Sequence, residues 1–371
     1  MDREKGLIEM VHGSGGRASA QLVDEIFLPA FDNEWLRPLG DQARILLEGG
    51  PWTMTTDSYV ITPYFFPGGD IGSLAVHGTV NDLSMGGAVP LYLTAAFILE
   101  EGFPIKDLVT ITNSMAHAAK EAGVALVTGD TKVVEKGKGG DGIYINTSGI
   151  GRIPEGVHLD PSNIRPGDTI LLSGSIGDHG SAVLAAREHW GLSTSLLSDS
   201  ASLHGLVACM LASAPGLVCL RDPTRGGVAT SLNEWAQTAG VDLLIDEERL
   251  PVREEVRGVC ELLGLDPLYL ANEGKLLAVC RKQGCRPASV GHEEPSIGPE
   301  LGYFRSCHGR SPKRPERSGS DDHSHGRHPD GGLAAGRPPS PNLLRKESRC
   351  HWKQGYYLRQ GPSTQAPLSS S

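Results

Sequence analysis

The chain has 371 residues, 39% of them hydrophobic, which is enough for two packed domains. Residues 1–280 carry 19 Lys and Arg against 36 Asp and Glu, a balance of −17, whereas residues 281–371 carry 15 against 8, a balance of +7. So acidic a body is not expected to bind nucleic acid, and without any run of eighteen apolar residues the chain is expected to be cytoplasmic rather than membrane-bound.

The first half of the chain predicts alternating strands and helices that close near Pro154. Helices are expected at 71–85 and 106–121, and Gly123 lies where the second helix needs a C-cap. Strands are expected at 52–56, 91–99, 124–128 and 143–150. We therefore expect a first domain over residues 1–155.

A second domain is expected over residues 156–280. It opens with a turn at 165–168 before a strand at 169–173, and helices are expected at 179–190, 203–212 and 227–239. The cysteines within it match no zinc or redox spacing. The fold class is therefore α+β, whereas residues 281–371 show no sustained period and are expected to be disordered.

Acidic and amide side chains stand beside tight glycine turns at two points of the first domain. Asp57 lies in Thr-Thr-Asp-Ser-Tyr-Val, and Asn81 and Asp82 lie in His-Gly-Thr-Val-Asn-Asp-Leu-Ser-Met-Gly-Gly-Ala, which begins at His77. Magnesium prefers carboxylate and phosphate oxygens, and glycine lets backbone N–H groups approach a polyphosphate. Each segment taken alone is equally well explained as an ordinary turn.

The same pattern recurs along the chain, which favours a nucleotide site. Glycine and charged residues meet again at 12–16, 40–43, 128–132, 149–152, 174–180, 221–227 and 272–275. Residues 174–180 read G-x-x-G-x-x-G rather than the dinucleotide fingerprint, and no G-K-[ST] closes a glycine loop. A Rossmann dehydrogenase and a P-loop ATPase are therefore disfavoured.

In order and wording these segments resemble the ATP-using superfamily of aminoimidazole ribonucleotide synthetase, selenophosphate synthetase and thiamine-monophosphate kinase. The resemblance runs from about Val11 to Val279 and is strongest to its hydrogenase maturation family, HypE. It implies a two-domain synthetase-like fold, and a homodimer of first domains whose interface holds ATP. It also implies an ATP-dependent carbamoyl dehydratase, which converts a thiocarboxamide on its C-terminal cysteine into the thiocyanate that supplies cyanide to [NiFe] hydrogenases.

The resemblance also implies roles for individual residues. Lys132 is expected to offset charge at the transferring phosphoryl group, and Glu273 to act as the base toward the amide nitrogen; a surface ion pair is the alternative for each. Magnesium ligands are expected at Asp57, Asp82 and Asp222, with Asp41 as a further candidate. Nucleotide contacts are expected at Gly13, Ser14, Gly15, Gly16, His77, Asn81, Asp130, Arg225, Gly226 and Gly227.

Partners and alternatives follow from the same resemblance. The family's partners are the carbamoyltransferase HypF and the iron-carrying HypC–HypD complex. One alternative is a small-molecule phosphotransferase of the superfamily; residues 12–16 lack the reactive Cys or Lys of selenophosphate synthetases, which weakens it. The other is a non-catalytic nucleotide-binding partner of the maturation machinery.

The tail departs from the family, whose members end in Pro-Arg-Ile-Cys. The run Ser-Pro-Asn-Leu-Leu-Arg at 340–345 can be encoded so that a one-base shift gives Pro-Arg-Ile-Cys followed by a stop codon. We therefore hypothesise a frameshift near 279–285, which would leave the second domain incomplete and remove the carrier cysteine. A genuine divergent extension is the alternative, and the acidic and histidine residues at 321–328 are not expected to form a metal site.

Overall fold

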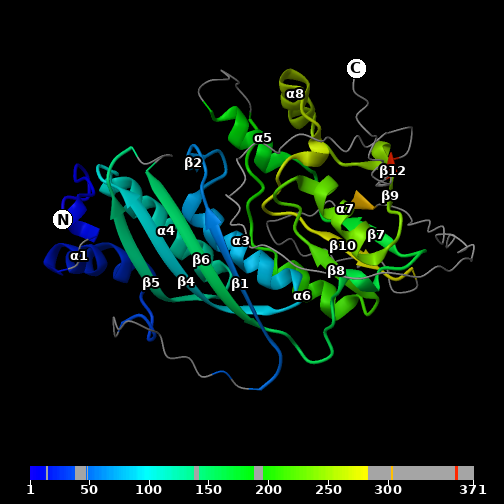
Figure 1. Cartoon of the computed structure of the whole chain (residues 1–371), viewed down its shortest axis with the longest axis horizontal. Coiled ribbons are helices and arrows are strands. Elements are labelled where there is room, and N and C mark those ends of the chain that lie inside the picture. Colours follow the sequence, from blue (N-terminus) through cyan, green and yellow to red (C-terminus); the bar gives the residue numbers. More distant parts are fainter. Residues whose placement is uncertain are drawn as a thin grey trace, which may run out of the picture.

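The computed structural model describes residues 1–13, 16–37, 47, 49–137, 142–187 and 195–282, together with two short strands at 302–303 and 356–357. Two α+β domains lie side by side, with the N-terminus at the outer end of the first (Figure 1). The helices of the first domain are η1 (Met10–Gly13), α1 (Gly16–Leu22), η2 (Val23–Phe27), α2 (Leu28–Phe31), α3 (Ile71–Met85) and α4 (Ile105–Glu121). Its strands are β1 (Trp52–Tyr59), β2 (Phe65–Phe66), β3 (Gly69–Asp70), β4 (Val89–Glu100), β5 (Ala125–Val134) and β6 (Ile143–Arg152).

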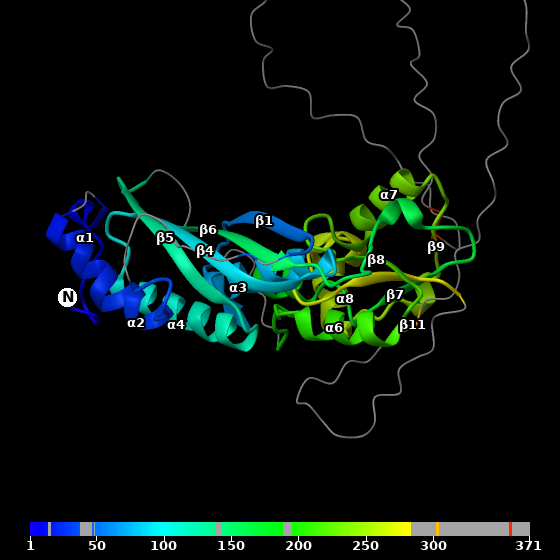
Figure 2. The same cartoon turned by 90° about the horizontal axis from the view of Figure 1, so that it is seen from below.

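The main sheet of the first domain has the order β1-β6-β4-β5, with β5 parallel to β4 and the other pairs antiparallel. Helices α3 and α4 cover one face of this sheet, and the view from below shows no helix on its other face among the described residues (Figure 2). Side chains alternate between the faces, so each residue's register position tells which face it occupies.

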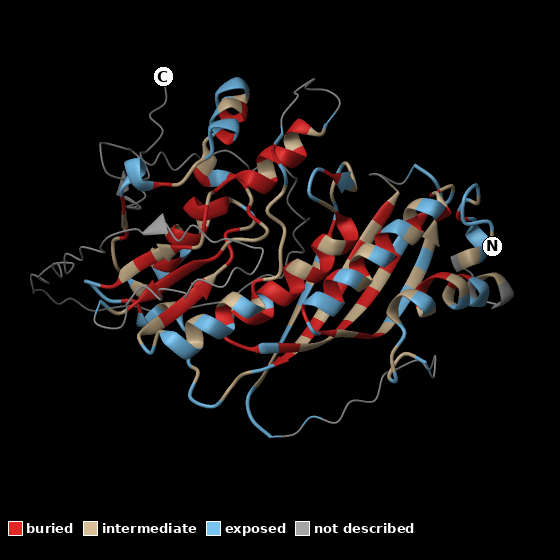
Figure 3. Cartoon of the chain, turned by 180° about the vertical axis from the view of Figure 1, so that it is seen from behind, coloured by how far each residue is buried: buried red, intermediate tan, exposed pale blue. Residues whose placement is uncertain are grey.

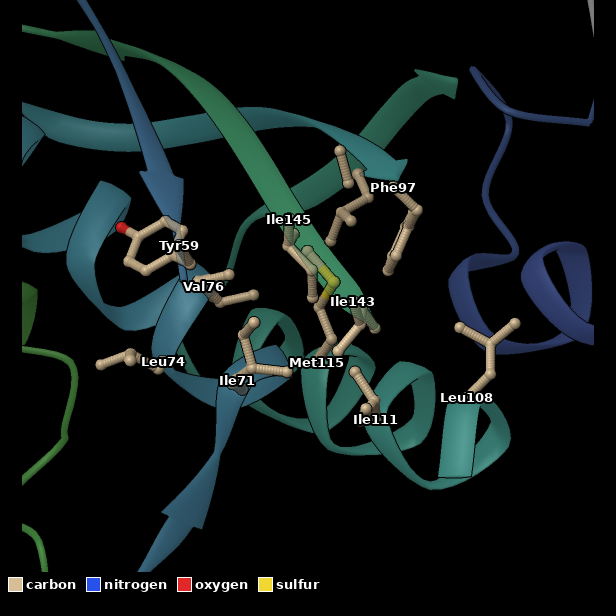
Figure 4. Packing of buried hydrophobic residues seen from close by; sticks show 14 of the residues in the cluster. Tyr59, Ile71, Leu74, Val76, Phe97, Leu108, Ile111, Met115, Ile143 and Ile145 are labelled. Carbon is tan, nitrogen blue, oxygen red and sulfur yellow. The ribbon is translucent and has the colours of Figure 1, made fainter. Parts of the chain in front are cut away.

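The core of the first domain fills the space between the sheet and its two helices. Ile145 of β6 and Phe97 of β4 face Met115 and Ile111 of α4, and all four are almost fully buried (Figure 4). The other face of the sheet carries apolar side chains that are not covered, with Met54 70% and Ile98 42% exposed. Burial of one face therefore fixes the register. Within the described part of the chain, neither α3 nor α4 covers the opposite face.

Helix α3 begins at a capping box, which sets where its polar residues lie. The side chain of Asp70 accepts from the backbone N–H groups of Gly72 and Ser73, and the Ser73 hydroxyl accepts from the Asp70 N–H. Ser114 of α4 adds a third donor to the same carboxylate at 2.6 Å. Nearly the whole length of the helix is buried, as Figure 3 shows.

We expect Asp70→Ala to lower the free energy of unfolding by about 1–2 kcal/mol, because two helix N–H groups lose their partner. In a protein of this size that corresponds to a melting temperature lower by roughly 2–8 °C. Asp160→Ala is the matched control, since Asp160 caps only the short turn η3 (Pro161–Asn163) through one N–H group. Equal losses in the two variants would contradict the assignment.

The second domain carries a smaller sheet of order β11-β7-β10-β8. Its strands are β7 (Thr169–Leu172), β8 (Leu217–Arg221), β9 (Leu244–Ile245), β10 (Leu277–Cys280), β11 (Gly302–Tyr303) and β12 (Tyr356–Tyr357). Its helices are η3 (Pro161–Asn163), α5 (Asp178–Ala185), α6 (His204–Ser213), α7 (Gly227–Ala239), η5 (Glu247–Arg249), α8 (Glu254–Leu263) and η6 (Pro267–Tyr269). A separate apolar cluster, which includes Trp235 and Leu172, forms its core.

Arg281 ties the end of β10 to the rest of this domain. Its backbone N–H donates to Gly216 O at 2.8 Å, and its guanidinium donates to Asn163 O and pairs with the buried Asp168. These contacts belong to the body of the fold, and the hypothesis of a frameshift near 279–285 stays a prediction. The expected disorder over 281–371 concerns residues that lie almost entirely outside the described part of the chain.

Two strands extend further than their sequence signals predicted. Strand β1 continues to Tyr59 and β5 to Val134, so Asp57, Asp130 and Lys132 lie within strands rather than in turns. None of the helices in the described ranges is long and apolar enough to cross a membrane.

Candidate active site

Four carboxylates from different elements gather where the two domains meet, and we call them the interdomain group. They are Asp57 of β1, Asp82 of α3, Asp222 directly after β8, and Glu273 before β10. Thr55 Oγ1 donates to Asp82 Oδ2 at 3.0 Å, which links the strand to the helix. Two domains thus contribute two carboxylates each to one place.

The carboxylates of the interdomain group act on one another's pKa values. Burial, followed by the charges of Asp82 and Asp57, raises the pKa of Asp222 to about 7. Burial, followed by the charges of Asp222 and three further carboxylates, raises the pKa of Glu273 well above its ordinary value. The site therefore concentrates more negative charge than it neutralises, and it favours a cation or a proton.

The loop between β8 and α7 lies beside this group. Arg225 Nη2 is 3.8 Å from Asp57 Oδ1 while its side chain remains 94% exposed, so this charge is available to another anion. Gly226 and Gly227 both have positive φ angles, 73° and 60°, and Gly227 opens α7. A Cβ on Gly227 would lie 2.5 Å from Leu268 O, which leaves room for glycine alone.

Lys132 and Asp130 lie elsewhere. Asp57 pairs with the buried Thr147 and therefore points to the helix-covered face of the sheet. Asp130 and Lys132 pair with Ala96 and Ile98, whose side chains belong to the other face, and β5 is the far edge strand from β1. A single chain thus does not bring Lys132 to the interdomain group. Instead, Lys132 Nζ lies 3.3 Å from Asp130 Oδ2 of the same strand.

The turn η1, which leads into the N-terminal glycine loop, lies at β5 rather than at the interdomain group. Gly13 ends η1 and Gly16 begins α1, and η1 packs against β5. Ser14, Gly15 and Asp41 lie outside the described residues. The predicted site residues considered so far that the structure describes therefore fall into two sets, one at the interdomain group and one at the β5 edge.

Two predicted nucleotide contacts are used differently. Asn81 is 1% exposed, its Oδ1 accepts from Leu203 N at 2.8 Å, and its Nδ2 donates to Ala201 O and Glu273 O. His77 Nδ1 is 3.0 Å from Ser200 Oγ, and burial lowers the pKa of this histidine to about 4. The amide of Asn81 is thus enclosed and bonded to protein backbone, and its predicted contact with a nucleotide stays a prediction.

These bonds reach a segment that the sequence signals missed, residues 195–203, which we call the strap. It has no regular secondary structure and runs between α3 of the first domain and the residues that follow η6 in the second. Asp199 lies at its middle with a side chain 2% exposed. A serine-rich run without hydrophobic period gives no sequence signal for such a role.

No three acidic, histidine or cysteine side chains of the described ranges lie close enough to enclose a metal ion. Magnesium does not require such a cage, because it commonly takes one or two carboxylates together with phosphate oxygens and water. Burial, and after it the charges of Asp82 and Asp57, raise the pKa of Asp222, and a bound dication would relieve that repulsion. The donor set of the interdomain group therefore fits magnesium held jointly with a polyphosphate.

Comparison with known proteins identifies the family. The profiles of the AIR synthase related protein N-terminal and C-terminal domains match residues 40–153 and 165–284. The carbamoyl dehydratase HypE of Azotobacter vinelandii is 61% identical over 280 residues, which cover 76% of this chain and 82% of the relative. This chain belongs to the HypE family.

Solved HypE structures agree with the fold. The crystal structure of a HypE in complex with ATP is 51% identical, has a TM-score of 0.72, and covers 75% of this chain and 82% of that one. The HypE of a HypE–HypF complex is 55% identical with a TM-score of 0.61 over 71% of this chain and 85% of that one. The expected two-domain synthetase-like fold of a HypE is thereby confirmed, and a small-molecule phosphotransferase is not favoured.

Proposed function

We propose that this chain is an ATP-dependent carbamoyl dehydratase that matures [NiFe] hydrogenases by converting a cysteine S-carboxamide into a thiocyanate. The observation that carries the proposal is the meeting of Asp57 and Asp82 with Asp222 and Glu273 at the domain interface. Family membership supplies the reaction, and a relative crystallised with ATP supports the nucleotide.

Asp57, Asp82 and Asp222 are proposed to hold magnesium together with phosphate oxygens of ATP, and the ion would neutralise charge on the polyphosphate. Gly226 and Gly227 present the N-terminus of α7, where backbone N–H groups and the helix dipole favour anions. Arg225, almost fully exposed, adds a cation beside them. These residues together orient the transferring phosphoryl group.

The reaction expels oxygen from an amide, and oxide is a poor leaving group. Transfer of the γ-phosphoryl group to the amide oxygen converts it into phosphate, which departs as the nitrogen loses its protons. Glu273 is proposed as the base: burial and four neighbouring carboxylates raise its pKa well above the ordinary value of a glutamate, which makes its carboxylate a stronger proton acceptor.

Lys132 is proposed to act from a second copy of the chain. Lys132 and Asp130 of the edge strand β5 lie on the sheet face that neither α3 nor α4 covers. Met54 and Ile98 on the same face are exposed. A homodimer that buries this face would remove apolar surface from water and bring a β5 edge to a partner. HypF, seen with a relative, and the HypC–HypD complex are proposed as further partners.

The test supplies an S-carbamoylated peptide ending in Pro-Arg-Ile-Cys, with ATP and magnesium, to the full chain. Loss of one water from the peptide, detected by mass spectrometry, is expected only when ATP is present. Nucleotide binding without any loss of water would favour the non-catalytic nucleotide-binding alternative and would refute the dehydratase proposal for this chain.

Arg225→Ala is expected to weaken Mg–ATP binding by roughly tenfold in isothermal titration calorimetry, because one charge-assisted contact to phosphate is lost. Its side chain is 94% exposed and its pair with Asp57 is long, 3.8 Å, so the melting temperature of the nucleotide-free protein should stay within about 1 °C. Arg249→Ala is the matched control, since Arg249 is an exposed arginine at the end of η5. A similar loss of affinity in both variants would show a general effect of surface charge.

A further inference from the structure

The strap holds the proposed base by its backbone. Glu273 N donates to Asp199 Oδ1 at 3.0 Å, and Ala201 N donates to Glu273 O at 3.3 Å. Asn81 Nδ2 donates to the same Glu273 oxygen at 3.3 Å. Both backbone polar groups of the base are therefore bonded to the strap or to the helix beneath it.

The two residues after Glu273 contact the same point of the strap. A Cβ on Gly274 would lie 1.7 Å from Asp199 O, so only glycine permits this approach. Lys275 Nζ is 3.5 Å from Asp199 Oδ2, and both side chains are largely buried, 17% and 2% exposed. Three consecutive residues thus lie against Asp199.

Asp199 is itself fixed from both sides. Ser198 Oγ is 2.8 Å from His179 Nδ1 of α5, and Ser198 N donates to Pro67 O at 2.8 Å. Ser200 Oγ is 3.0 Å from His77 Nδ1 of α3. The strap therefore takes its position from both domains and cannot shift without breaking bonds to each.

We infer that Asp199 is a positioning residue of the dehydratase, which sets the place of the Glu273 carboxylate through the Glu273 backbone and Lys275. This inference rests on the proposed function. Asp199 does not touch substrate; it acts through another residue, and a base displaced by about 1 Å can lose roughly 100-fold in rate. Asp199 is thus a further residue of the proposed site, and it lies outside every sequence motif.

The test uses Asp199→Ala and Asp199→Asn in the full chain. Amide hydrogen exchange in the peptide over 271–276 is expected to accelerate at least tenfold in Asp199→Ala, whereas Asp199→Asn, which keeps an acceptor oxygen, should retain protection. Turnover of the carbamoylated peptide should fall about 100-fold in Asp199→Ala, with the dissociation constant of Mg–ATP changed less than threefold.

Asp168→Ala is the matched control. Asp168 is also buried in the second domain, accepts a backbone N–H from Arg165 at 2.8 Å and pairs with Arg281. The Asp168→Ala variant should be less stable than wild type, but the amide hydrogen exchange of 271–276 should keep its wild-type rate. Unchanged exchange in Asp199→Ala, or an equal acceleration in Asp168→Ala, overturns the inference. If the wild-type chain binds ATP without turning over the peptide, the proposed function fails while the exchange measurement still decides the positioning role.

Discussion

Asp222→Asn is expected to stabilise the nucleotide-free protein at pH 8 and to abolish detectable Mg–ATP binding. Burial and the charges of Asp82 and Asp57 raise the pKa of Asp222 to about 7 in the folded protein, whereas an unfolded aspartate titrates near 4. Its ionisation therefore opposes folding, by a ceiling of about 4 kcal/mol at pH 8. A neutral amide removes that cost together with a carboxylate that we propose as a magnesium ligand.

The gain should depend on pH in a direction fixed by this shift. Because the folded pKa lies above the unfolded one, the wild type loses stability relative to Asp222→Asn as pH rises from about 4 through 7. The melting-temperature difference between the two proteins should therefore be largest at pH 8 and shrink toward pH 4. Asp246→Asn, at an exposed position, should show no such trend. A variant no more stable than wild type at pH 8 would contradict the repulsion within the interdomain group.

Two inactive variants are expected to restore each other when they are mixed. Lys132→Ala and Glu273→Gln should each lower peptide dehydration at least roughly 100-fold, because one loses the charge beside the phosphoryl group and the other loses the base. In one chain Lys132 lies on the sheet face opposite to that of Asp57, which belongs with Glu273 to the interdomain group. Each site should therefore combine Lys132 of one copy with Glu273 of the other. Random reassociation then leaves about one quarter of the sites intact.

The measurement is the specific activity after the two variants are co-expressed or mixed under reassociating conditions. A chain that carries both substitutions, mixed with wild type, is the control. Each site of that mixed dimer has one substituted residue, so only the wild-type dimers, about one quarter of the mixture, should stay active; a site formed within one copy would leave about half of the sites intact. Activity that stays at the level of either variant alone would contradict a site shared between copies.

Much of the fold follows from local signals. The helix expected at 71–85 is α3 (Ile71–Met85), because its apolar positions and its aspartate and serine cap agree on the same start. Strand β5 was predicted too short, because Gly129 and the polar residues after it are typical of a turn. Gly129 instead lies inside the strand, where a Cβ would meet Ala95 O at 2.4 Å.

The geometry of the site was harder to predict from the sequence, because it depends on contacts between distant segments. The motifs single out Asp222 and Glu273, which the fold brings beside Asp57 and Asp82, and their roles stay predictions. No motif shows which sheet face Lys132 occupies, since that depends on register across β4. Nothing in the residues around Asp199 shows that three later residues pack against it.

The strap also bears on how such a chain can be recombined. Its bonds run to His77 and Asn81 in one domain and to His179 and Lys275 in the other. A chimaera that joins the first domain of one relative to the second domain of another keeps these bonds only if all four side chains match the inherited strap. The two domains should therefore be transferred together in a chimaera, even though each has a hydrophobic core of its own.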